Sequence, residues 1–203
     1  MLDDNLNAKD YKDLVIEAGI GLIPYVGGSL QTLYFGAQNE KRFKRIESFY
    51  KQLSQKIGEL ESFELDSSNG EKVIGIIDTI HDEIEKARSH DKVVYFVNAY
   101  KNLLLSSENI KGLDMDELFV DILSEISKTE IEILANLFRL KQQVGTSLSG
   151  YDSTLVAGSM ESLSNRGLVN KHLQRLQIGG LGGQEYKYSI SYLGTSFCEY
   201  ILH

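Results

Sequence analysis

The first clear periodicity of the chain lies between residues 43 and 60, where apolar side chains recur at spacings of three and four. The seam consists of Phe43, Ile46, Tyr50, Leu53, Ile57 and Leu60. This spacing over three heptads predicts an amphipathic helix with one buried stripe. We interpret it as one helix of an antiparallel bundle. A homodimeric coiled coil through residues 43–60 is the alternative, although three heptads are short for independent pairing.

Similar apolar stripes predict further helices in the first two thirds of the chain. The segments are 71–88, 91–105 and a third that starts near residue 114. Asp114 and Glu117 have the spacing of a capping box in which Asp takes the place of Ser. We therefore expect residues 1–128 to form a bundle of about five helices joined by short loops.

The pattern changes after residue 128. Thr129 and Glu132 have capping-box spacing and predict a helix over 130–140, and a second helix is predicted over 153–166. Strand character begins at Leu168 and returns where Tyr186, Tyr188 and Ile190 alternate with polar residues. The glycine run 179–183 predicts a hairpin tip, and a short helix is expected over 195–202.

Two phrases in this part of the chain are similar to a known domain. In LVAGSMESLSNRGLV, residues 155–169, a helix ends in the form L-x-x-x-G-L-V. In YSISYLGTSF, residues 188–197, a strand with inward Tyr188 and Ile190 turns at Gly194 into a helix anchored by Phe197. Both phrases, and the order helix–loop–helix–strand–strand–helix, resemble the winged helix-turn-helix domain. The resemblance covers residues 129–203 and implies a mostly α protein with a small β-hairpin wing.

A winged helix implies a binding site on its second helix and its wing. Five residues are expected to face outward on the helix: Thr154, Ser159, Ser162, Asn165 and Arg166. Three are expected to face outward on the wing: Lys171, Arg175 and Lys187. Asn and Arg read base edges in DNA, and Lys and Arg hold phosphates. These eight residues are the candidate DNA- or partner-binding site.

Charge departs from what the family's DNA-binding members need. The whole chain carries a net charge of −8. Residues 1–127 carry 23 acidic and 14 basic side chains, and residues 128–203 carry 6 and 7. Residues 145–165 contain no Lys or Arg, and Glu161 lies within the expected recognition helix. DNA readers place positive charge there, so a winged helix used for protein contacts is the alternative.

The segment 18–39, AGIGLIPYVGGSLQTLYFGAQN, contains 22 residues without a charge. That length is enough to span a bilayer. Five glycines dilute its hydrophobicity, and Pro24 with the Gly27–Gly28 pair interrupts a helix in its middle. We therefore expect a buried or interfacial hairpin. Reversible contact with a membrane is a further alternative.

No constellation of residues predicts catalysis, a cofactor or a metal site. His81 with Asp78, Asp82 and Glu85 supplies too few ligands for a metal and is interpreted as part of a solvated helix face. Cys198, the single cysteine, is interpreted as a small core residue. One cysteine and an acidic N-terminus favour a cytoplasmic protein.

These observations lead to two hypotheses, each for a non-catalytic bacterial protein. The first is a DNA-binding transcription-type regulator, in which the helical region senses a ligand or dimerises and the winged helix binds DNA. The second is a protein-interaction adaptor or membrane-associated effector that acts through residues 18–39, with the winged helix used for protein contacts.

Overall fold

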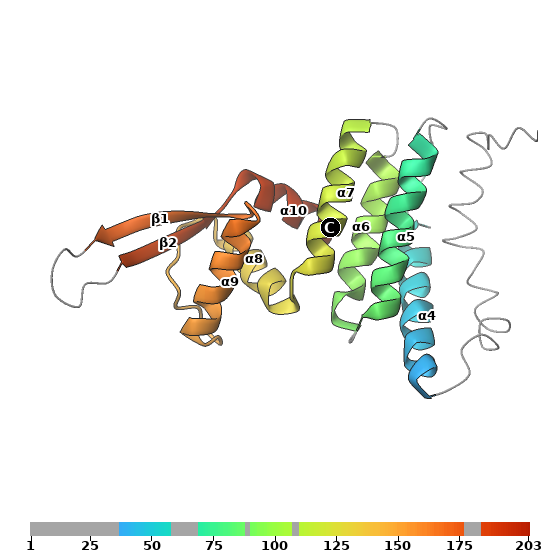
Figure 1. Ribbon diagram of the computed structural model, residues 1–203, viewed down its shortest axis with the longest axis horizontal. Coiled ribbons are helices and arrows are strands. Elements are labelled where there is room, and N and C mark those ends of the chain that lie inside the picture. The colour runs from blue at the N-terminus through green and yellow to red at the C-terminus, as the bar shows by residue number, and fades with distance from the viewer. Residues whose placement is uncertain (1–36, 58–68, 88–89, 107–109, 177–183) are drawn as a thin grey trace, which may run out of the picture. The chain divides into compact units, whose positions relative to one another are not determined.

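The computed structural model describes residues 37–57, 69–87, 90–106, 110–176 and 184–203 (Figure 1). Over these residues the chain is mostly helical, with one two-stranded antiparallel sheet near its C-terminus. This confirms the predicted fold class of a mostly α protein with a small β-hairpin. Residues 18–36 of the uncharged segment lie outside the described residues. No helix within the described residues is long and apolar enough to cross a membrane.

The chain divides into two compact units between Ser124 and Glu125. The boundary expected from the sequence lies after residue 128. Of the residues between these two boundaries, Ile126 is buried, and Ser127 caps the helix that follows. Each unit has its own buried apolar side chains.

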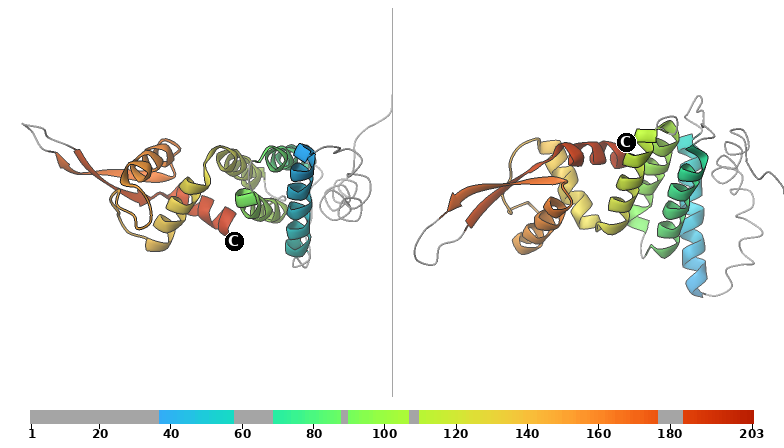
Figure 2. Two further views of the ribbon diagram at one scale, coloured as in Figure 1. Left: turned by 90° about the horizontal axis from the view of Figure 1, so that it is seen from below. Right: turned by 45° about the horizontal axis from the view of Figure 1, so that its top comes forward.

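The first unit is built from four α-helices and a short 3₁₀ helix over its described residues. They are α4 (Ala37–Ile57), α5 (Gly70–Lys86), η3 (His90–Lys92), α6 (Val93–Ser106) and α7 (Ile110–Glu125). Helix α4 packs on both α5 and α6 and crosses α5 at an angle, as Figure 2 shows. Contact with two helices buries a wider arc than the predicted a/d seam. Phe49, which lies off that seam, is therefore 0% exposed beside Leu53.

Polar side chains tie α7 to its neighbours in a way that local sequence rules did not predict. Helix α7 begins at Ile110, so Asp114 and Glu117 lie inside it and do not form the expected capping box. Their carboxylates instead both bind the Lys72 ammonium group of α5, with 2.9 Å between Lys72 Nζ and Glu117 Oε2. Ser106 at the end of α6 donates to the buried carboxylate of Asp116.

The second unit contains three helices and the hairpin. They are α8 (Lys128–Leu140), α9 (Ser153–Asn165), β1 (Val169–Leu176), β2 (Gln184–Ile190) and α10 (Tyr192–Leu202). Helix α8 begins with a capping box formed by Ser127 and Glu130, so the prediction that Thr129 and Glu132 form it was wrong. Ser127 Oγ accepts from the Glu130 amide at 3.2 Å, and the Glu130 carboxylate accepts from the Ser127 amide at 2.7 Å.

The hairpin pairs Val169 with Ile190 and Lys171 with Tyr188, and its register is interrupted by a bulge between Leu173 and Arg175. On the outer edge of β2, Val144 makes an isolated bridge to Tyr188 through two backbone hydrogen bonds of 2.8 and 2.9 Å. The segment before α9 is thus anchored to the hairpin. Figure 1 shows the hairpin extending away from α8 and α9.

Two positions of the second unit require glycine, each for a different structural reason. Gly167 follows the end of α9 with φ of +74°, a conformation that favours glycine. Gly194 lies within the first turn of α10, where a Cβ atom would overlap the Leu168 carbonyl oxygen. The closing helix begins at Tyr192, three residues before the predicted start at Thr195. Gly194 thus lies inside the helix, where it permits close packing and does not form the expected turn.

Candidate functional site

The eight candidate residues differ in exposure. Thr154, Asn165, Lys171 and Arg175 are exposed, and Ser162, Arg166 and Lys187 are partly exposed. Ser159 is only 8% exposed, so the prediction that it faces outward was wrong. It lies on the stripe of α9 that also carries the buried side chains of Val156, Met160 and Leu163, and the helical spacing of three and four turns it inward.

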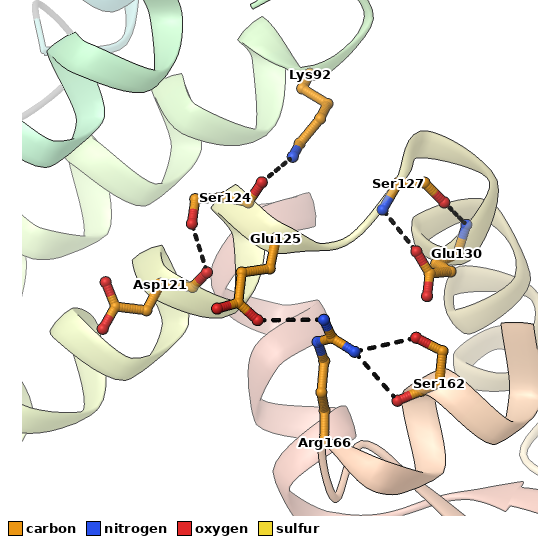
Figure 3. Close-up of polar contacts among 8 residues, drawn as sticks. All are labelled: Lys92, Asp121, Ser124, Glu125, Ser127, Glu130, Ser162 and Arg166. Carbon is orange, nitrogen blue, oxygen red and sulfur yellow. Dashed lines mark hydrogen bonds and ion pairs between the residues drawn. The ribbon is translucent and has the colours of Figure 1, made fainter. Parts of the chain in front are cut away.

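Arg166 is held by residues of its own unit. It is the C-cap residue of α9, and its guanidinium lies 3.2 Å from the Glu125 carboxylate and 3.0 Å from the Ser162 hydroxyl (Figure 3). The Glu130 carboxylate also interacts electrostatically with Arg166. Burial raises the pKa of Glu130, but hydrogen bonds from Ser162 and Ser127 and the charge of Arg166 outweigh burial and lower it. The ion pair with Glu125 therefore compensates the Arg166 charge, and Glu130 adds a weaker electrostatic attraction.

Lys171 is compensated in the same manner. Its ammonium nitrogen lies 2.5 Å from the Glu161 carboxylate and 3.9 Å from the centroid of the Tyr186 ring. Tyr188 donates to the same Glu161 oxygen at 2.7 Å. The hydrogen bonds from Lys171 and Tyr188 lower the pKa of Glu161, whereas burial and the Glu161 carboxylate raise the pKa of Tyr188 to about 12. This cluster joins the hairpin to α9, and within it the charge of Lys171 is paired with that of Glu161.

The N-terminal end of α9 carries a negative charge. Asp152 is the N-cap, and its carboxylate accepts from the backbone amides of Thr154 at 2.9 Å and Leu155 at 3.1 Å. An acid at this position stabilises the helix through its unpaired amides and its dipole. In a helix-turn-helix protein the same end of the recognition helix contacts the base edges, where an acid meets the phosphates. Asp152 thus favours helix stability over an approach to DNA.

One side of α9 carries four exposed residues without a charge, next to the half-exposed Glu161 that pairs with Lys171. We define the α9 surface as Thr154, Leu155, Gly158 and Asn165, which are exposed and lie along one side of the helix. Leu155 is 48% exposed and was not among the residues selected from the sequence. No charged side chain belongs to this set. Arg175 and Lys187 on the hairpin form no ion pair with a described residue and are the remaining cations of the candidate site.

The connection between α8 and α9 spans residues 141–152 and contains no helix. It begins with Lys141 in a left-handed conformation and is tied back to α8 by Tyr151, which donates to the Glu132 carboxylate at 2.6 Å. A helix-turn-helix joins its two helices by a turn of about three or four residues. Helices α8 and α9 therefore do not form that compact pair.

The other residues weighed for chemistry have structural environments. His81 is half-buried, with its Nε2 atom 2.7 Å from the Tyr50 hydroxyl, so it does not lie on a solvated face as predicted. Cys198 is buried, as predicted, and burial raises its pKa to about 12. The described part of the chain contains no group of three or more His, Cys, Asp or Glu side chains arranged to hold a metal ion.

No family model, no curated protein and no solved structure matches this chain. The fold and the site define a small helical unit with a two-stranded hairpin, in which four exposed uncharged residues of α9 lie near two cations, Arg166 and Lys171, that carboxylates of the same unit neutralise. The sequence alone showed Glu161 as an acidic residue within the expected recognition helix. It did not indicate Glu125, because Glu125 lies 41 residues from Arg166 and no local pattern connects the two.

Proposed function

We propose that residues 125–203 form a winged-helix module that binds a protein partner through the α9 surface, and that the chain acts as a non-catalytic adaptor. The order of elements supports the winged-helix assignment. Helix α8, the bridging residue Val144, helix α9, the two strands and α10 follow one another along the chain, and Val144 pairs with β2 through an isolated bridge.

The observation that carries the protein-binding proposal is the pair of ion contacts Arg166–Glu125 and Lys171–Glu161. Affinity for the DNA backbone comes from Lys and Arg side chains that replace the counterions of phosphates. In this unit two of the four candidate cations are already paired with carboxylates. A regulator that binds DNA would have to break both contacts and accept Asp152 beside the phosphates.

The α9 surface has the composition of a protein interface. Cores of protein–protein interfaces are depleted in charge and contain exposed apolar side chains that a partner covers. Leu155 is such a side chain, and Thr154 next to it and Asn165 at the other end of α9 offer hydrogen-bonding groups without a charge. Gly158 has no neighbour within 4 Å of the position of an added Cβ, so the surface is open at its middle.

A photo-crosslinking amino acid at position 155 of the full chain, expressed in its native host, tests the proposal. The matched control is the same substitution at Leu140, which is also 48% exposed but lies at the end of α8. We expect a discrete protein adduct from position 155 and none from position 140. Crosslinks to DNA from position 155 would overturn the proposal and favour the regulator hypothesis. Equal protein adducts from both positions would also overturn the proposal.

A further inference from the structure

A cluster of aromatic rings and one histidine joins three helices of the first unit. Phe49 and Tyr50 come from α4, His81 from α5 and Tyr100 from α6. The His81 ring lies edge-on to Phe49 and Tyr50, at centroid distances of 6.2 and 5.5 Å, and is stacked with Tyr100 at 6.5 Å. The attachment of α4 to α5 and α6 therefore includes a group that titrates near neutral pH.

The neutral form of His81 suits this environment. The Tyr50 hydroxyl lies 2.7 Å from His81 Nε2, and a neutral imidazole protonated on Nδ1 accepts the hydroxyl proton there. Burial raises the pKa of Tyr50 far above its usual range, so its hydroxyl remains a neutral donor. The Tyr100 hydroxyl is buried without a hydrogen-bond partner. When His81 gains a proton, Nε2 becomes a donor and the Tyr50 proton loses its acceptor.

The charges near His81 raise its pKa by less than burial lowers it. Burial lowers the pKa of His81 most, and Asp78 and Asp82 on the same helix raise it by a smaller amount, so the pKa lies below its ordinary value. From the described elements packed against α5, the groups that face His81 are Tyr50 on α4 and Tyr100 on α6. Both are uncharged, and neither compensates an imidazolium.

We propose that the Tyr50–His81 contact makes the attachment of α4 to α5 and α6 acid-sensitive, so that protonation of His81 loosens α4 from the first unit. The direction follows from proton linkage. An unfolded or detached histidine binds its proton more tightly than the packed one, so the attached state is favoured above the ordinary histidine pKa. Attachment weakens as the pH falls through that value and changes no further once packed His81 is itself protonated. This inference does not depend on the function proposed for the second unit.

Amide hydrogen exchange on the full chain tests the proposal at about pH 7.5 and about pH 5.5, on either side of the ordinary histidine pKa. Protection is corrected for the intrinsic exchange rate at each pH. We expect peptides within 44–57 to lose protection relative to α8 peptides at the lower pH, by at most about tenfold per pH unit. His81→Gln should abolish this loss because Gln accepts the Tyr50 proton at both pH values. An unchanged loss in that variant, or no loss in the wild type, would overturn the proposal.

The matched control is His172→Gln. His172 also makes a hydrogen bond, 2.9 Å from Nε2 to the Ser189 hydroxyl, but it lies on the hairpin of the second unit. It should leave the pH dependence of α4 intact. If His81→Gln does not fold, the imidazole resonances of the wild type and of Tyr50→Phe decide. We expect His81 to titrate below the ordinary histidine pKa, and to titrate at a higher pH when the Tyr50 hydroxyl is removed. Titration of His81 at or above the ordinary histidine pKa, or no change in Tyr50→Phe, would refute the inference.

Discussion

Neutralising the two carboxylates that hold Arg166 and Lys171 should turn the second unit into a weak DNA binder. The perturbation is the double substitution Glu125→Gln and Glu161→Gln. Residues 125–203 carry seven acidic and seven basic side chains, so the variant has two uncompensated positive charges. Each phosphate contact contributes about −0.9 to the slope of log affinity against log salt, and two contacts steepen that slope by about 1.8.

The assay is fluorescence anisotropy of a labelled random-sequence duplex, with the full chain titrated at several salt concentrations. The wild type should show little binding even at low salt, whereas the variant should bind at low salt and lose that affinity as salt rises. The charge-matched control is Glu185→Gln with Glu199→Gln, which removes two exposed carboxylates that do not pair with Arg166 or Lys171. The control should bind less tightly than the test variant.

Two results would refute this reasoning. Equal DNA affinity in the test and control variants would show that net charge, and not the two ion pairs, limits binding. Tight, sequence-selective binding by the wild type at moderate salt would show that DNA displaces Glu125 and Glu161 without help. Loss of exposed ion pairs costs only about 0.2–1 kcal/mol each, so both variants should remain folded, which circular dichroism verifies.

The remaining predictions concern stability and reactivity of the second unit. Gly194→Ala should destabilise it by about 2–3 kcal/mol in urea unfolding, because the added Cβ meets the carbonyl oxygen before β1. Gly158→Ala, where the Cβ meets nothing, should instead stabilise it by about 0.5–1 kcal/mol, and equal effects of the two would contradict the packing argument. Ser127→Ala should cost about 1 kcal/mol by leaving the Glu130 amide without its cap, unless water replaces the hydroxyl fully. Cys198, with a pKa raised to about 12, should resist iodoacetamide in the native state and react in urea; rapid native labelling would show that it is not held in the core.

Local patterns predicted which elements form but not where each begins. The apolar periodicities around residues 43–57 and 153–166 indicated helices that the structure contains. The starts of α8 and α10 were missed because a cap depends on backbone conformation as well as residue type. Ser127 and Ser191 lie at the caps with extended backbone, whereas Thr129 already lies inside α8.

The candidate binding surface was predicted only in part. Asn165 and Thr154 are exposed as expected, but Ser159 is buried and Leu155 is exposed. Hydrophobicity alone does not predict the exposure of a polar residue within an apolar stripe, or of an apolar residue outside it. Their exposure depends on which arc of α9 the neighbouring elements cover.

The sequence by itself determined that this is a mostly helical protein with a C-terminal hairpin, because helical periodicity, strand alternation and glycine positions act between near neighbours in the chain. The tertiary structure decided which charges are available. Arg166 meets Glu125 across 41 residues, and Tyr50 meets His81 across 31. Charge compensation and burial depend on distances in space, which folding sets between residues that are far apart in the sequence.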